Sequence, residues 1–192
     1  MSVVHLLRHG EVHNPAGILY GLRPGYHLSE RGRRMAASVA GSFSSVDLVL
    51  SSPLERAVET ASFVASRFGL AARTDVRLIE GASAFEGDVL RGLWWVRHWR
   101  RLHNPFRPSW GEPYLEQVSR MASCVEEARS SADVAVLVGH QLPIWVTRQW
   151  YSSRRLWHLA GERECELASV TTLTFSSDGS VSVSYRAGGS DQ

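Results

Sequence analysis

The sequence predicts an α/β fold with three layers, in which a mostly parallel central sheet carries helices on both faces. Three short segments, 3–7, 46–50 and 134–138, are apolar and rich in branched residues, as buried strands are. Amphipathic stretches with helical spacing lie between them, and strands that alternate with helices form parallel sheets. The length of 192 residues and the lack of a long Gly, Ser or Pro linker predict one domain, residues 1–192.

The composition is that of a globular protein, with 44% hydrophobic and 21% charged residues. The formal net charge of +2 gives no reason to expect a nucleic-acid partner. No apolar run approaches the ~18 residues of a membrane span, and the first residues lack a signal-peptide pattern. Two cysteines, Cys124 and Cys165, form no disulfide framework. We therefore expect a cytoplasmic protein with a small-molecule substrate, as a monomer or a homodimer.

The first half of the chain predicts two strands, each followed by a helix. After the strand at 3–7, Ser29 is suited to cap the first helix. The strand at 46–50 leads into a second helix, for which Ser52, Pro53 and Glu55 fit the N-cap, N1 and N3 positions of a capping box. Helical spacing predicts two inward faces: Met35, Ala36, Val39, Ala40 and Phe43 in the first helix, and Leu54, Ala57, Val58, Ala61, Val64, Ala65 and Phe68 in the second.

The second half continues the alternation after an irregular stretch at 71–87. Pro113 is expected to open a helix with Leu115, Val118, Met121, Ala122 and Val125 inward. The strand at 134–138 ends at Gly139-His140 and is followed by a helix through Trp145. The tail reads as a hairpin over 167–185, with strands at 167–175 and 181–185 around a turn at 177–179.

Basic side chains follow all three predicted parallel strands. Arg8 and His9 end the first, Arg56 lies just beyond the second, and His140 ends the third. Because ligands collect beyond the carboxyl ends of parallel strands, we expect these four residues to converge. Arginine donates planar pairs of hydrogen bonds and a helix start adds free N–H groups, so the predicted ligand is a phosphate.

At this point the sequence resembles a known family, the histidine phosphatase superfamily, also called the phosphoglycerate mutase-like family. Four motifs occur in the family's order and cover the chain from Val3 to about Trp150. These are Leu7-Arg8-His9-Gly10-Glu11 with Asn14; Ser51-Ser52-Pro53-Leu54-Glu55-Arg56-Ala57 with Glu59-Thr60-Ala61; Phe85-Glu86-Gly87; and Gly139-His140.

The resemblance implies a role for each matching residue. His9 matches the nucleophile that becomes phosphohistidine, and Arg8, Arg56 and His140 match the residues that bind the phosphate oxygens. Asn14 matches a further phosphate contact. The family's proton donor usually precedes the glutamate of a Trp-Glu-Gly-like motif by seven residues, whereas here Glu80 precedes Glu86 by six. Glu80 is the first choice for this acid and Glu86 the second.

Further residues are candidates for shaping the pocket. Tyr20, Gly21 and Arg23 follow the first motif and are expected to line it. The segment 90–110, rich in Trp and Arg, corresponds to a family segment that lies over the pocket, so a lid or packing role is favoured over a protein interface or nucleic-acid binding. Histidines at 5, 9 and 13 have helical spacing, but the strand pattern and Gly10 argue against a metal site there.

The favoured function is hydrolysis of a small phosphate monoester through phosphohistidine, without metal or cofactor, because arginines supply the charge that phosphoryl transfer needs. A phosphoglycerate-type mutase and a non-catalytic phosphate-ligand or protein-binding module remain alternatives. His140 is followed by Gln141-Leu142-Pro143, which matches neither the Gly-Asn of mutases nor the His-Gly-Gly pattern of phosphatases. The chain is short for a mutase, which favours hydrolysis.

Overall fold

The computed structural model describes residues 1–89, 111–158 and 160–188. Within them a six-stranded sheet has the order β3-β2-β4-β1-β5-β6. The pairs β3-β2, β2-β4 and β4-β1 are parallel, whereas β5 is antiparallel to both of its neighbours. The strands are β1 (Ser2–Arg8), β2 (Leu48–Ser51), β3 (Arg73–Thr74), β4 (Val134–Gly139), β5 (Val170–Phe175) and β6 (Val181–Arg186).

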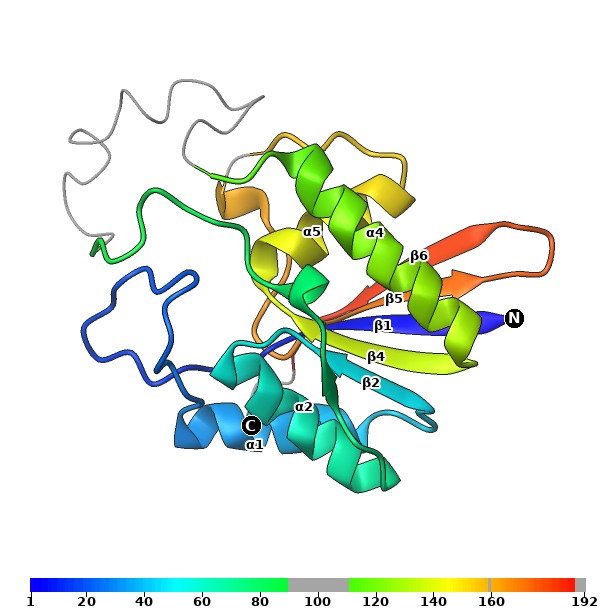
Figure 1. Ribbon diagram of the computed structural model, residues 1–192, viewed down its shortest axis with the longest axis horizontal. Helices are drawn as coiled ribbons and strands as arrows, with labels where there is room; N and C mark the ends of the chain where they lie inside the picture. The colour runs from blue at the N-terminus through cyan, green and yellow to red at the C-terminus, as the bar shows by residue number, and fades with distance from the viewer. Residues whose placement is uncertain (90–110, 159, 189–192) are drawn as a thin grey trace.

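Helices cover both faces of this sheet, as predicted (Figure 1). One face carries α1 (Glu30–Gly41) and α2 (Glu55–Phe68), and the other carries α4 (Tyr114–Ser131) and α5 (Gln141–Tyr151). Two short 3-10 helices, η1 (Val76–Leu78) and η2 (Ala160–Glu162), lie in the connections. The fold is therefore the expected three-layer α/β arrangement.

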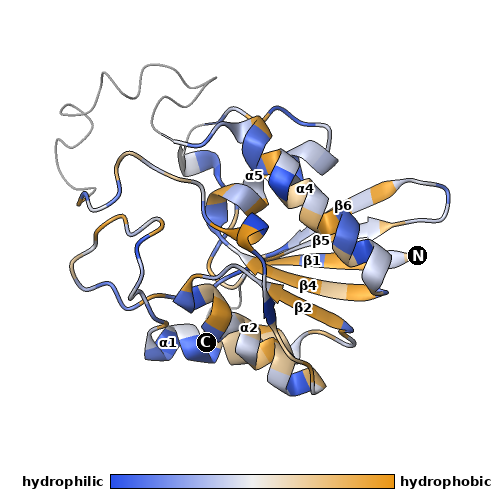
Figure 2. Ribbon diagram, viewed as in Figure 1, coloured by the Kyte–Doolittle hydropathy of each residue, from blue (hydrophilic) through white to orange (hydrophobic). Residues whose placement is uncertain are grey.

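The central strands β1, β4 and β2 are mostly apolar on both sides, and Figure 2 shows the centre of the sheet largely in orange. In β1, Val4 and Leu6 enter the core beneath α4 and α5, whereas Leu7 enters the core formed with α1 and α2. The neighbouring strand is in matching register, with Leu6 beside Leu137. A strand buried on both faces reads as a continuous apolar run, which explains why β1 and β4 were visible in the sequence.

Single positions on two predicted helical faces differ in the structure. In α4, Val118, Met121 and Val125 are buried as predicted, but Leu115 is 64% exposed. Tyr114 and Gln117 are buried at that end of the helix instead. Val58, predicted to lie on the inward face of α2, is 37% exposed. The helix buries its Arg56, Ala57 and Thr60 side, which faces the functional site.

The predicted capping box at the start of α2 is wrong. The helix begins at Glu55 with Leu54 as N-cap residue, and no side chain caps it. By contrast, the predicted cap of α1 is confirmed, because the Ser29 hydroxyl accepts a hydrogen bond from the Gly32 amide. The C-terminal hairpin is also confirmed, although its first strand starts at Val170 rather than at 167. The segment 90–110 lies outside the described residues.

In the parts of the chain that the structure describes, no helix is both long and apolar enough to span a membrane.

Candidate active site

The carboxyl ends of β1, β2 and β4 meet at one edge of the sheet, as the parallel arrangement requires. Arg8 is paired with Gly139 across the two central strands. The next amide, of His9, donates a hydrogen bond of 3.1 Å to the Gly139 carbonyl, and Ser52 N donates one of 2.9 Å to the Val138 carbonyl. The expected convergence of the three strand ends is therefore confirmed.

The loop after β1 is held by close packing against both helices of its face. The Gly10 amide donates to Thr60 Oγ1 of α2 at 3.1 Å. A Cβ atom on Gly10 would lie 2.5 Å from the Gly32 carbonyl oxygen of α1, so only glycine permits this approach. Since Gly10 directly follows His9, this contact fixes the backbone that carries the candidate nucleophile.

The His9 ring is buried and presents one nitrogen for chemistry. Its Nδ1 donates a 2.7 Å hydrogen bond to the Gly10 carbonyl, which leaves the Nε2 lone pair available. The ring lines a cavity of about 160 Å³. Burial lowers the pKa of His9 well below its usual value, and the charges of Arg8 and Arg56 lower it further. The imidazole is therefore neutral at physiological pH, as an attacking nitrogen must be.

Arg8 and Arg56 are anchored by backbone carbonyls while part of each guanidinium has no acceptor. Arg8 Nη1 donates to Cys165 O at 2.5 Å, and Arg56 Nη2 donates to Gly21 O at 2.6 Å. Among the described residues, Arg8 Nε and Arg56 Nε and Nη1 are buried without a hydrogen-bond partner. Buried donors without acceptors are costly unless a ligand accepts their hydrogen bonds, and these donors carry positive charge. They fit an anion.

His140 contributes a further buried ring to the site. It contacts Ser52, the residue that the sequence analysis assigned to the N-cap of α2. Its Nε2 lies 2.7 Å from Ser52 Oγ, which itself receives a long 3.4 Å bond from the Leu54 amide. Since no other acceptor for the buried Ser52 hydroxyl is present among the described residues, we infer that it donates to Nε2 and that the proton of neutral His140 is on Nδ1. That Nδ1 is buried and unpartnered among the described residues. The His9 and His140 ring centroids are 5.2 Å apart.

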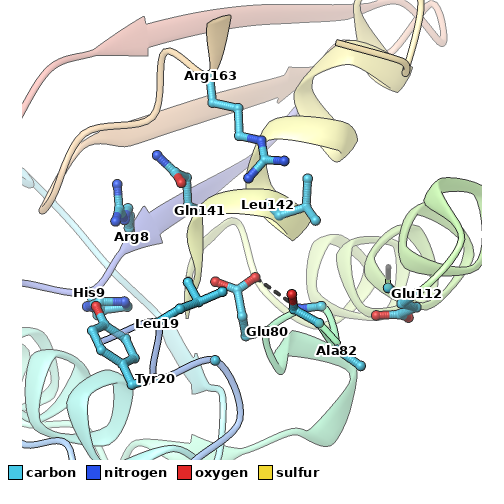
Figure 3. Close-up of a pocket in the computed structure, with 14 residues that line it drawn as sticks. Arg8, His9, Leu19, Tyr20, Glu80, Ala82, Glu112, Gln141, Leu142 and Arg163 are labelled. Atoms are coloured by element: carbon cyan, nitrogen blue, oxygen red, sulfur yellow. Dashed lines mark hydrogen bonds between the residues drawn. The ribbon is translucent and has the colours of Figure 1, made fainter. Parts of the chain in front are cut away.

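Glu80 lines the same cavity as His9 (Figure 3). Its Oε1 accepts a 2.9 Å hydrogen bond from the Gly81 amide. Burial raises the pKa of Glu80, against the opposing effects of the Gly81 hydrogen bond and of the Arg8, Arg56 and Arg163 charges. A carboxyl group with a raised pKa beside a neutral imidazole is suited to general acid catalysis.

Glu86, the second choice for the acid, is held outside the residues that line this cavity. Its Oε1 accepts from the Ser83 amide at 3.2 Å. Its side chain lies against Gly21, where φ is +44° and a Cβ atom would overlap the glutamate. Its observed contacts therefore order the Tyr20–Gly21 loop, and the geometry favours Glu80.

The other predicted pocket residues divide into two groups. Tyr20 and Gly21 line the cavity, and the Tyr20 ring lies 4.7 Å from the Arg56 guanidinium carbon. Arg23 is exposed and donates a weak 3.5 Å bond to the Glu86 carbonyl. Asn14 is engaged in a turn, with hydrogen bonds of 2.8 and 3.3 Å to the Ile18 backbone. The structure does not bring Arg23 or Asn14 to the cavity.

Sequence reasoning did not find two further cavity residues, Gln141 and Arg163. Gln141 donates weakly, at 3.4 Å, to the Cys165 carbonyl that also anchors Arg8. The departure of Gln141 from the family pattern after His140 was the sequence signal that could have identified it as a cavity residue. Nothing in the local sequence marks Arg163, which lies far along the chain in a loop. No group of three or more His, Cys, Asp or Glu side chains within the described ranges is placed to hold a metal ion.

A neutral buried imidazole, buried cationic donors without acceptors and a buried carboxyl group with a raised pKa are together suited to phosphoryl transfer. Comparison with known proteins agrees: residues 4–187 match the model of the histidine phosphatase superfamily, branch 1. The chain belongs to this superfamily.

Two relatives cover nearly the whole chain. It is 48% identical to the uncharacterized protein Rv0525 of Mycobacterium tuberculosis over 95% of this chain and 94% of that one. The structure of this chain resembles that of mycobacterial glucosyl-3-phosphoglycerate phosphatase Rv2419c in complex with VO3. The two are 25% identical, the TM-score is 0.78, and the match covers 96% of this chain and 97% of the other.

A third relative is a 2,3-bisphosphoglycerate-dependent phosphoglycerate mutase of Thermoplasma acidophilum. It is 39% identical over 83 residues, which is 42% of each chain.

Proposed function

We propose that the protein hydrolyses small phosphate monoesters through a phosphohistidine intermediate on His9. The observation that carries this proposal is the set of unpartnered buried donors on Arg8, Arg56 and His140 beside a neutral His9 whose Nε2 is free. Vanadate bound to a structural neighbour supports an oxyanion ligand here.

The first half-reaction transfers the phosphoryl group to the histidine. His9 Nε2 attacks phosphorus in line, the P–O bond to the alcohol breaks, and the departing oxygen takes the proton of Glu80. Arg8, Arg56 and His140 Nδ1 donate to the non-bridging oxygens, where charge is spread in the transition state.

The second half-reaction regenerates the enzyme. The Glu80 carboxylate, now ionised, accepts a proton from water as that water attacks the phosphohistidine. The P–N bond breaks, inorganic phosphate leaves and Glu80 is protonated again. Glu80 therefore acts first as acid and then as base, with no net change in the protein.

The experiment that tests the proposal is removal of the nucleophile. His9→Ala should lower turnover of p-nitrophenyl phosphate and glycerol 3-phosphate by roughly a million-fold, because the covalent step is lost. Acid-quenched wild-type protein with labelled substrate should carry acid-labile phosphate on His9. His13→Ala is the matched control, since His13 is an exposed histidine four residues away that should leave turnover unchanged. Retention of a tenth of the activity by His9→Ala would overturn the proposal.

The partial match to a phosphoglycerate mutase keeps phosphoryl transfer to a second hydroxyl as the alternative function. Free phosphate should appear in step with substrate loss if water is the acceptor. Interconversion of 2- and 3-phosphoglycerate faster than phosphate release would instead identify a mutase. If phosphate analogues bind while no ester reacts, the protein is a binding module.

A further inference from the structure

Arg163 is a cation in the cavity that none of the steps above uses. It follows η2 and lines the same cavity as His9 and Glu80. Figure 3 shows its side chain extending toward Gln141, Leu142 and Glu80. The side chain therefore faces the space that the alcohol portion of a substrate would occupy.

A buried histidine holds this guanidinium in place. Arg163 Nε lies 2.7 Å from His158 Nε2, and His158 Nδ1 lies 2.7 Å from the Leu156 carbonyl. Nδ1 must donate to that carbonyl, so Nε2 is the acceptor for Arg163. Burial lowers the pKa of His158, which keeps the ring neutral. The ring packs between Tyr114 and Trp145, with centroids 5.4 and 5.7 Å away. A neutral acceptor orients Arg163 without cancelling its charge.

Neither carboxylate that lines the cavity pairs directly with Arg163. Glu112 binds Arg120 through both oxygens at 2.7 and 2.8 Å. Glu80 interacts electrostatically with Arg163, but it accepts its hydrogen bond from the Gly81 amide. Within the described residues, no carboxylate forms an ion pair with Arg163. An oriented guanidinium of this kind at a cavity wall is suited to binding an anionic group.

We propose that Arg163 determines specificity by binding a second anionic group, a carboxylate or a phosphate, on the alcohol portion of the substrate. His158 is its positioning residue. The inference rests on the proposed phosphatase function, which it narrows to anionic phosphate monoesters. Leu19 and Leu142 line the cavity and would contact the carbon skeleton of the alcohol.

The test compares substrates that differ only in the second group. One pair is 3-phosphoglycerate and glycerol 3-phosphate; the other is propane-1,3-diol bisphosphate and 3-hydroxypropyl phosphate. Wild-type protein should have the higher kcat/KM for the charged member of at least one pair, and that pair identifies the group as carboxylate or phosphate. Arg163→Gln should lower this kcat/KM about 10- to 100-fold, mainly through KM, and change the uncharged member less than about threefold.

Two further variants separate recognition from structure. Arg154→Gln removes an exposed arginine from the same segment and should leave kcat/KM unchanged for both members of each pair. His158→Phe keeps an aromatic ring but removes the acceptor, so it should raise KM for the charged member while kcat for p-nitrophenyl phosphate stays constant.

Equal losses on both members of a pair would overturn the inference, because Arg163 would then act through Glu80 or the fold. So would the absence of any wild-type preference for the charged member. If wild-type protein hydrolyses none of these esters, the proposed function fails, and calorimetric binding of the same pairs then tests Arg163 separately. Tighter binding of a charged member that Arg163→Gln abolishes supports the assignment, and equal affinities overturn it.

Discussion

At the scale of single residues, burial has opposite effects on the pKa values of the proposed nucleophile and the proposed acid. It lowers the pKa of His9 and raises that of Glu80, because it disfavours the charged form of each. Burial therefore favours the neutral imidazole of His9 and the protonated carboxyl group of Glu80 together. One desolvated site thus prepares both a nucleophile and an acid.

The first prediction follows from the raised pKa of Glu80. Activity on alkyl phosphates should fall on the basic side, where the acid loses its proton, and on the acid side only below the usual histidine pKa of about 6.5. Glu80→Gln should flatten the basic limb and slow glycerol 3-phosphate far more than p-nitrophenyl phosphate, whose leaving group needs little protonation. The measurement is kcat/KM against pH for both substrates.

Glu86→Gln is the control for this prediction. Glu86 accepts a hydrogen bond from the Ser83 amide and packs on Gly21. Any decrease in kcat/KM caused by Glu86→Gln should therefore be the same for both leaving groups. If the dependence appears in Glu86→Gln and not in Glu80→Gln, the assignment of the acid is wrong.

The second prediction concerns the Ser52 hydroxyl, which sets the position of the proton on His140. Ser52→Ala should lower kcat about 3- to 10-fold and weaken vanadate inhibition to a similar extent, because the donor at His140 Nδ1 is no longer fixed. Ser51→Ala is the matched control: that buried hydroxyl donates at 2.8 Å to the Ser52 carbonyl. Equal effects of the two substitutions on vanadate inhibition would show that Ser52 serves only packing.

At the scale of secondary-structure elements, α1 supports the catalytic loop through close backbone contact. A Cβ atom on Gly32 would overlap the Glu11 backbone, two residues after His9. Gly41 lies in the same helix with nothing within 4 Å of the corresponding position. The same substitution, glycine to alanine, can therefore be compared at a crowded and at an open position of one helix.

The third prediction uses this comparison. Gly32→Ala should destabilise the protein by about 3 kcal/mol and reduce activity, because the helix must move away from the loop. Gly41→Ala should leave activity unchanged and stabilise the protein by about 0.5 kcal/mol, since alanine is the better helix former. Urea unfolding and kcat measure both effects. A Gly32→Ala protein with wild-type stability would contradict the close approach.

The sequence predicted those elements whose burial leaves a regular pattern. Strands β1 and β4 are buried on both faces, so they appear as apolar runs, and the α1 cap depends on neighbouring residues alone. Leu115 was misplaced because the face of α4 is chosen by tertiary contacts of Tyr114 and Gln117. The start of α2 was misplaced because Ser52 bonds His140, 88 residues away, rather than its own helix.

The site was predictable to the extent that strand ends position it. Parallel strands bring their ends together by topology, so Arg8, His9 and His140 could be grouped from the sequence. Glu80 was less certain because it lies in an irregular segment. Arg163 could not be found, since its orientation depends on a histidine and two aromatic rings that meet only in the folded protein.

At the scale of the whole molecule, the cavity is assembled from segments that span most of the chain. β1 supplies Arg8, the segment after η1 supplies Glu80, α5 begins with Gln141, and the loop after η2 supplies Arg163. Each of the first three follows a strand end or lies beside one. The sheet therefore acts as the common support for groups that are remote in sequence.

The last prediction concerns what the molecule needs from outside. Phosphoryl transfer requires positive charge around the non-bridging oxygens, and Arg8, Arg56 and His140 offer donors there without a metal ion. Turnover should therefore survive prolonged EDTA treatment within about twofold, whereas an alkaline phosphatase treated in parallel loses its activity. Vanadate should inhibit competitively, because it presents the same oxygens to the same donors. Loss of activity in chelator that zinc or magnesium restores would show that these cations do not suffice, and that the charge assigned to the arginines comes from a metal.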